Sequence, residues 1–265
     1  MADLRLLVSL ESARSICSTE TIDIDARGVP YRALNAELAS LVDRGARCLS
    51  LHAVSGQRYL GTNLKAPVSM VIEGVPGNDL GAFMDGPLVE VLGDAQDGCG
   101  NTMNSGLLAI HGSAGDIVGH SMRGGTILVN GNAGYRVGIH MKEYGEQRPA
   151  IVIGGTAQHF LGEYMAGGVI LVLGANLEAG EIHPSRYIGT GMHGGVIYLR
   201  GPFDDRYLGK EVGVAELDAE DWITVRQYVV AFAACFGRDP DALLDGSFLK
   251  LYPRTRRPYG RLYAY

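Results

Sequence analysis

A short pattern of methionine, glycine and apolar residues recurs along the middle of the chain. The repeating methionines are Met84, Met103, Met122, Met141, Met165 and Met192. The first four are separated by 19 residues each, the last two follow after 24 and 27, and Leu64 takes the equivalent place 20 residues before the first. Such a period is typical of repeat architectures, in which each unit is one small supersecondary element.

A glycine stands three residues before each of these seven positions. These glycines are Gly61, Gly81, Gly100, Gly119, Gly138, Gly162 and Gly189. The complete unit is Gly-x2-Gly-x3-Gly-x2-Met, as in residues 112–122, and Gln57, Gln96 and Gln158 replace its middle glycine elsewhere. Repeated tight turns need positive φ or close approach of neighbouring turns, and glycine allows both. We therefore predict that the glycines mark corners.

Each corner leads into a short apolar segment, as in RGGTILVNG, AGGVILVLG and HGGVIYLRG. Five and seven residues after the methionine stand apolar pairs such as Ile127 with Val129 and Ile170 with Val172. This spacing of two predicts one face of a β-strand, which we expect to point inward. The residue directly after the methionine is usually polar, which predicts an outward corner.

A unit of one strand and glycine corners cannot bury its apolar face alone, so it must stack on its neighbours. The sequence therefore predicts a mainly β protein with a β-helix of about seven rungs over residues 57–202. Insertions at residues 142–148 and 176–187 lengthen two units, and we expect both on the surface.

The flanking segments differ in composition and are expected to cap the open ends of the stack. Residues 1–56 predict a small α/β cap, with a strand in ETIDIDAR and a helix that buries Leu34, Leu38, Leu41 and Val42. Residues 203–265 predict a helical segment, with one helix starting near Asp218 and a second after Asp239, followed by a basic tail.

The composition is that of a globular chain with a substantial core. It is 46% apolar, contains 38 glycines and has a net charge of -6. The acidic balance argues against a general nucleic-acid or anionic membrane surface. The start of the chain lacks the layout of a signal peptide, and no apolar run is long enough to span a membrane, so we expect a cytoplasmic protein.

Candidate chemistry is sparse. Cys17, Cys48, Cys99 and Cys235 form no CxxC pair and are predicted to be buried thiols. The dinucleotide-like segment 189–194 is followed by a strand where that motif needs a helix, and the segment 119–123 lacks the final glycine of a nucleophile elbow. The histidines share no position in the repeat. We predict no catalytic, cofactor-binding or metal-binding residue.

The tail from residue 250 to residue 265 is the least ordinary segment, because it carries five basic residues and no acidic one. Its candidate partner-docking residues are Arg254, Arg256, Arg257, Tyr259 and Arg261. An acidic partner surface would complement them, and the tyrosines would supply contact area. The alternatives are a merely solvated tail and a tail that caps the β-helix.

Two long segments, GEYMAGGVILVLG at 162–174 and GMHGGVIYL at 191–199, resemble the C-terminal β-helix of the glutamate synthase large subunit. The resemblance covers residues 54–201, and YRALNAEL and RPYG resemble the flanks of stand-alone versions of this domain. It implies a right-handed, single-stranded β-helix with an architectural role. Glutaminase-type and FMN-barrel synthase subunits would be its partners, and FMN and an iron–sulfur cluster would reside on them.

The two long segments and the glutamine substitutions favour the glutamate synthase type, but the Gly-x2-Met rungs alone also fit a second family, which is the alternative. The third subunit of formylmethanofuran dehydrogenase, or of the bacterial formyltransferase/hydrolase complex, has a similar β-helix, and N-methylglutamate synthase would look alike. The substrate of the complex, 2-oxoglutarate with ammonia or methylamine, or a formyl carrier, stays open at this stage. An independent hydrolase working from a groove on the solenoid is the competing hypothesis.

Overall fold

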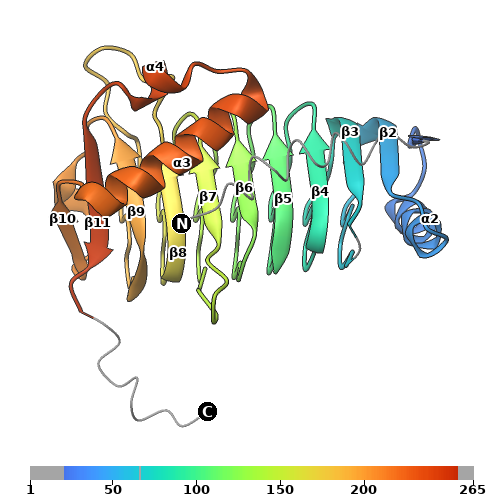
Figure 1. Cartoon of the computed structure of the whole chain (residues 1–265), viewed down its shortest axis with the longest axis horizontal. Helices are drawn as coiled ribbons and strands as arrows, with labels where there is room; N and C mark the ends of the chain where they lie inside the picture. The colour runs from blue at the N-terminus through green and yellow to red at the C-terminus, as the bar shows by residue number, and fades with distance from the viewer. Residues whose placement is uncertain (1–20, 66, 256–265) are drawn as a thin grey trace, which may run out of the picture.

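The computed structural model describes residues 21–65 and 67–255, and its strands form a single sheet (Figure 1). The strands are β1 (Ile22–Asp25), β2 (Cys48–Ser55), β3 (Ser69–Val75), β4 (Asp85–Val91), β5 (Ser105–Ile110), β6 (Thr126–Val129), β7 (Ala150–Ile153), β8 (Ala166–Val172), β9 (Gly194–Arg200), β10 (Val212–Ala215) and β11 (Phe248–Pro253). The helices are α2 (Tyr31–Asp43), α3 (Ala219–Phe236) and α4 (Pro240–Leu244), with a 3-10 turn, η1, at Asp205–Tyr207.

Strands β1 to β9 are parallel, and each pairs with the next one in sequence. The seven strands β3 to β9 each follow one of the predicted glycine corners, so the β-helix is confirmed. The register keeps equivalent residues of the repeat side by side, since Ile127 pairs with Ile151, Ile151 with Ile170, and Ile170 with Ile197. In Figure 1 the rungs follow one another along the long axis of the molecule.

The interior of the β-helix is filled by the periodic apolar residues. The six repeat methionines are at most 1% exposed, and the isoleucine stack of β6 to β9 lies in the same cluster. A flexible thioether fills the irregular space beside each corner well. Ala95, Ala114, Ala133 and Ala157 form a second ladder of parallel bridges on another side of the coil, where only a small side chain fits inside.

The outer face of strands β5 to β9 is also buried, because α3 lies across it (Figure 1). Val225, Val229 and Phe232 of α3 belong to one cluster with outward residues such as Leu128 and Leu171. This second layer explains why β6 and β7 are buried at every position. Among the described residues, none of the helices has the length and apolar content needed to cross a bilayer.

Helix α3 begins and ends where its sequence predicts. Asp218 caps its N-terminus in a reciprocal capping box with Asp221, and Gly237 ends it in the left-handed conformation, with φ of 64°. Asp221 is nearly buried and accepts hydrogen bonds from Tyr198 Oη on β9 (2.6 Å) and Lys250 Nζ on β11 (2.8 Å). Burial alone would raise the pKa of Asp221, but these two donors hold it below its ordinary value. The network fastens the helix to the sheet.

The N-terminal cap agrees with its sequence pattern. Leu34, Leu38 and Val42 of α2 are buried, and β1 continues the sheet beside β2. Gln57, which replaces a middle glycine, donates to the carbonyl of Ala26 (2.8 Å) and accepts from the backbone N–H of Ser55 (2.6 Å). One side chain therefore joins the cap to the first corner.

The prediction that the tail from Lys250 stays outside the solenoid is wrong for its first residues. β11 lies between β9 and β10 and pairs antiparallel with both, and Leu251 is fully buried in the interior cluster. The last parallel rung would otherwise leave a row of unpaired backbone groups, which β11 satisfies. Residues 250–253 thus cap the β-helix, which was the alternative.

The two insertions lie on the surface as expected, with one difference. Residues 142–148 are exposed throughout, whereas His183 and Ser185 of the second insertion are buried. Ser185 donates to the carbonyl of Ala157 (2.5 Å), and His183 Nε2–H donates to the carbonyl of Arg200 (2.8 Å). Burial lowers the pKa of His183, so the imidazole is neutral at pH 7. These two residues tie the insertion back to the coil.

Replacing Gly119 by valine should destabilise the chain by about 3 kcal/mol. Its φ is 68°, and a Cβ there would collide with Ile151 Cδ1 in the interior. Arg123→Ala, four residues away on the exposed side of the same corner, should change the unfolding free energy by about 0.5 kcal/mol or less. Urea unfolding followed by circular dichroism measures both. Equal losses for the two variants would contradict the assignment of inside and outside.

Asp221→Asn should lower the unfolding free energy by about 2 kcal/mol at pH 7, because Lys250 then loses the nearer of its two carboxylate partners and keeps only Asp218, 3.7 Å away. Since the folded pKa of Asp221 lies below the ordinary 3.8, this stabilisation is present above pH 3.8 and is lost as pH falls through the folded pKa. The difference in unfolding free energy between the wild type and Asp221→Asn should therefore become smaller at low pH. Glu220→Gln, at the exposed neighbouring position, is the control, and a gap that stays constant down to low pH would contradict the network.

Candidate functional site

The glycine corners share one backbone conformation that sets the exposed surface of the coil. In the corner before Met141, Arg136, Gly138 and His140 have φ values of 57°, 70° and 56°, so every second residue is left-handed. The same alternation recurs from Tyr59 to Tyr187. A left-handed residue with a side chain costs about 1 to 2 kcal/mol. The corner therefore needs interactions that offset this strain.

Hydrogen bonds from each corner to both neighbouring turns offset the strain of its left-handed residues. The N–H of Gly138 donates to the carbonyl of Val118 in the preceding turn (2.8 Å). The flanking residues donate in the other direction, Arg136 to His159 (3.0 Å) and His140 to the next turn (3.1 Å). Arg136 and His140 are both exposed, so their side chains project outward from the corner.

The first two glycines of the unit have another role. Gly115 has no positive φ, but a Cβ there would collide with Asp97 Oδ1 of the preceding turn. That oxygen accepts from the N–H of Asp116 (2.9 Å), and Asp116 Oδ1 accepts from the N–H of Tyr135 one turn later (2.8 Å). These glycines leave room for a ladder of side chains that satisfy the backbone of the next turn.

The outward residues stack in two columns. We call the first the aromatic column, and it consists of Arg136, Phe160, Tyr187 and Tyr207. The guanidinium of Arg136 lies 4.8 Å from the ring centroid of Phe160. The ring centroids of Phe160 and Tyr187 are 5.1 Å apart in a stacked pair, and those of Tyr187 and Tyr207 are 6.3 Å apart in an edge-on pair. In the second, the rings of His140 and Tyr164 stack at 5.3 Å with only 8° between their planes. Both columns follow from the rung spacing, which holds equivalent side chains at stacking distance.

A groove of about 780 Å³, which we call the corner groove, lies beside the second column. Its walls come from residues just before or just after the repeat methionines of β6 to β9, together with residues near β10 and the end of β11. They include Ser121, Arg123, His140, Lys142, Tyr164, His193, Glu211 and Thr255. Side chains from turns far apart in sequence therefore converge on one polar surface.

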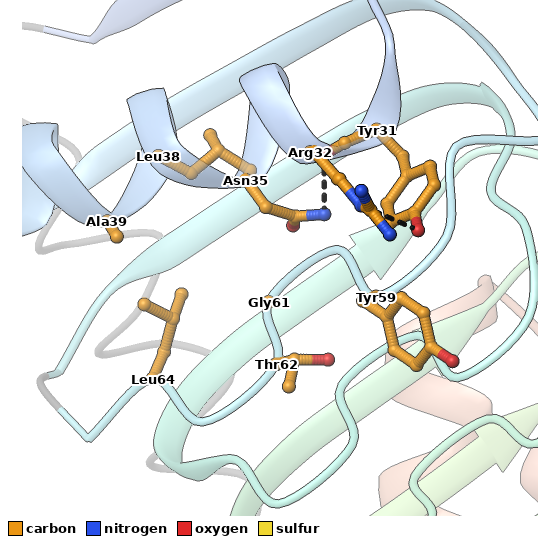
Figure 2. A pocket seen from close by; sticks show the side chains of 9 residues that line it. All are labelled: Tyr31, Arg32, Asn35, Leu38, Ala39, Tyr59, Gly61, Thr62 and Leu64. Carbon is orange, nitrogen blue, oxygen red and sulfur yellow. Dashed lines mark hydrogen bonds between the residues drawn. The ribbon is translucent and has the colours of Figure 1, made fainter.

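A smaller pocket of about 330 Å³ lies between α2 and the first corner (Figure 2). In Figure 2, Leu38 and Ala39 of the helix face Leu64 across it, and Tyr31 and Tyr59 stand at one end. Asn35 donates to the carbonyls of Tyr31 and Arg58, both at 2.8 Å. The pocket is mainly apolar, and its walls join the N-terminal cap to the coil.

One cluster brings a serine, a histidine and two carboxylates together on the uncovered outer face of β1 to β3. Ser50 Oγ lies 3.2 Å from His52 Nε2, which is also 3.0 Å from Asp23, while His52 Nδ1 is 2.8 Å from Glu73. Hydrogen bonds to Asp23 and Glu73 raise the pKa of His52. Both ring nitrogens are engaged by carboxylates on the neighbouring strands, which makes His52 a poor general base for Ser50.

The three cysteines of the described residues, Cys48, Cys99 and Cys235, are buried. Burial raises the pKa of Cys99 to about 12. The prediction of four thiols is wrong for Cys48, which is disulfide-bonded, and Cys17 lies outside the described residues. Within residues 21–65 and 67–255, no three histidine, cysteine or acidic side chains are placed to hold a metal ion. The two motif-like segments, 119–123 and 189–194, are corners of the repeat that lead into strands or turns.

Most of the predicted docking residues lie outside the described part of the chain, namely Arg256, Arg257, Tyr259 and Arg261. Arg254 is exposed, and its N–H donates to the carbonyl of Glu211 (2.7 Å) beside the corner groove. The groove itself was missed by sequence analysis. The sequence feature that could have identified the groove is the polar or aromatic residue on either side of the repeat methionines. Arg123, Lys142 and His193 directly follow a repeat methionine, and His140 and Tyr164 directly precede one.

Comparisons with known proteins agree with this architecture. The family described as GXGXG motif matches residues 40–254. The uncharacterized protein MJ1350 of Methanocaldococcus jannaschii is 44% identical over 253 residues, which cover 92% of this chain and 97% of the relative. A chain in the crystal structure of the formyltransferase/hydrolase complex of Methylorubrum extorquens with methylofuran has the same fold, with a TM-score of 0.59 and 21% identity over 86% of this chain and 92% of that chain.

His52 should titrate above its ordinary pKa of 6.5, and Asp23→Asn should move its pKa back down. The raised pKa means that the ion pairs stabilise the fold fully below pH 6.5 and are lost as pH rises through the folded value. Titration of the histidine resonances by NMR measures the shift. Hydrolysis of p-nitrophenyl acetate that disappears in Ser50→Ala would show instead that the cluster is a catalytic site.

Proposed function

The chain belongs to the GXGXG motif family, and we propose that it is a non-catalytic β-helix subunit of a multi-subunit enzyme complex. Its role is positional, because it holds partner subunits at fixed distances from one another. Fixed distances matter when an intermediate made at one active site is consumed at another. The long, regularly hydrogen-bonded stack is suited to this role.

The observation that carries the proposal is the aromatic surface along the corners. Tyr135, Tyr164 and Tyr187 are 41%, 47% and 46% exposed, yet each is held by stacking or by the left-handed backbone beneath it. Tyrosine and arginine are common anchors of protein interfaces. Side chains that are already ordered lose little conformational entropy when a partner binds. Such a surface favours docking over solvation alone.

The chemistry of the described residues is consistent with a structural role. The arrangement nearest to a hydrolytic site is Ser50 beside His52, and there the imidazole is occupied by Asp23 and Glu73. Cys99 is fully buried and protonated at pH 7. An independent hydrolase would need an accessible nucleophile with an available base, so we favour the structural subunit.

A complex of the formyltransferase/hydrolase type is the first candidate. The likeness to a chain of that complex covers 86% of this chain and 92% of that chain. The second candidate is a glutamate synthase-like complex, favoured by the segments 162–174 and 191–199. In that case glutaminase-type and FMN-barrel subunits would be the partners, and FMN and the iron–sulfur cluster would be bound by them.

Affinity purification of the tagged full-length chain from cells that encode it tests the proposal. We expect it to elute in a complex with fixed stoichiometry, and mass spectrometry of the partners separates the two candidates. Phe160→Ala with Tyr187→Ala should weaken retention of at least one partner about tenfold. Ile223→Ala with Val230→Ala, at exposed apolar positions of α3, is the matched control. A chain that elutes alone and turns over substrate after repurification would overturn the proposal.

A further inference from the structure

Two cations of the corner groove make no ion pair with the residues around them. Arg123 and Lys142 are exposed on its wall, and within the described residues neither side chain has an ion-pair partner. They occupy the same repeat position, directly after Met122 and Met141, so they stand one rung apart. The two cations therefore point from adjacent turns into one space.

The two acidic residues of the groove are already engaged. Glu143 accepts from Arg148 Nε (3.1 Å) and from the N–H of Gly168 (3.0 Å). Glu211 accepts from the N–H of Gly191 (3.3 Å). Each carboxylate thus serves the local structure, and neither bonds to Arg123 or Lys142. Glu143 is balanced by Arg148, so Arg123 and Lys142 are the two cations of the wall that have no carboxylate partner among the described residues.

The floor of the groove is rigid and partly aromatic. Tyr164 stacks on His140, and the other side of its ring lies over Gly191, where a Cβ would overlap the ring. His193 follows on the next rung. A flat, ordered surface between cationic walls suits a ligand that offers both carboxylates and apolar contact.

The size of the groove decides between a small anion and a longer ligand. It is lined by residues of four consecutive turns, which span about 14 Å at a rung spacing of about 4.8 Å. An extended peptide covers that length with about four residues, whereas one carboxylate or phosphate would meet a single rung. Thr255, just after β11, forms part of the wall.

We propose that the corner groove binds an extended acidic segment of a partner subunit, whose carboxylates pair with Arg123 and Lys142 while a neighbouring side chain packs on Tyr164. This inference rests on the proposed function, since it assigns one docking site within the complex. The aromatic column and the corner groove would then engage different parts of the partners.

Fluorescence anisotropy with the full-length chain tests the groove directly. The probe is a fluorescein-labelled peptide, Gly-Asp-Asp-Tyr-Asp-Asp-Gly, and its neutral counterpart has Asn in place of Asp. We expect saturable binding of the acidic peptide only, weakened about tenfold by Arg123→Glu with Lys142→Glu and weakened by salt between about 50 and about 300 mM. Arg44→Glu with Arg238→Glu reverses two exposed charges elsewhere and should leave binding unchanged.

Three results would overturn the inference. Equal loss of binding in both double variants would show a non-specific charge effect. Equal binding of the neutral peptide would show that charge is not what the groove selects. Displacement of the acidic peptide by an equal concentration of inorganic phosphate would show a site for a single small anion.

The same variants separate this inference from the proposed function. If the tagged wild-type chain captures its partners and the Arg123→Glu, Lys142→Glu chain retains all of them with unchanged affinity, the groove assignment is wrong and the structural subunit stands. If the wild-type chain captures no partner, the proposed function fails whatever the peptide shows. Thermal melts of both double variants should match the wild type, because all four side chains are exposed.

Discussion

The alternating direction of the corner hydrogen bonds determines much of the architecture. At each corner the central glycine donates backward, as Gly138 does to Val118, and the residues on either side donate forward, as Arg136 does to His159. In this arrangement the central glycine and the residues two before and two after it have positive φ. Positive φ favours glycine at the central position, and the residues on either side place their side chains on the outside of the corner. The same constraint therefore buries the methionines, keeps the strands in register and creates the exposed columns.

The repeat was predictable because its determinants lie close together in sequence. A glycine three residues before a methionine and two apolar residues on one face of the next strand are local features, and Gly119, Met122 and Ile127 show them within nine positions. The caps of α3 at Asp218 and Gly237 are local as well. Such features predict elements and burial from one sequence.

Contacts between distant segments were not predictable in this way. The apolar face of α3 indicates burial but does not identify the outer face of β5 to β9 as its partner. β11 returns to the sheet 48 residues after the end of β9, as the difference between Arg200 and Phe248 shows. The corner groove depends on residues of four turns and on insertions of unequal length, so its composition becomes visible only once the register is known.

Rigidity connects the fold to the proposed role. Because backbone groups at the corners are bonded to turns on both sides, a partner bound at one rung is held at a fixed distance from a partner bound at another. The aromatic column spans the turns from Arg136 to Tyr207, and the corner groove lies beside the second column of the same corners. A scaffold with two such surfaces needs no reactive group of its own.

Hydroxyl-radical footprinting of the isolated chain and of the assembled complex tests the central claim most directly, because it compares the exposure of individual aromatic and aliphatic side chains in the two states. The account predicts that Tyr164 and Tyr187, which are 47% and 46% exposed in the isolated chain, become protected in the complex, while Ile223 on α3 reacts equally in both states. Protection of α3 with unchanged reactivity along the corners would contradict it.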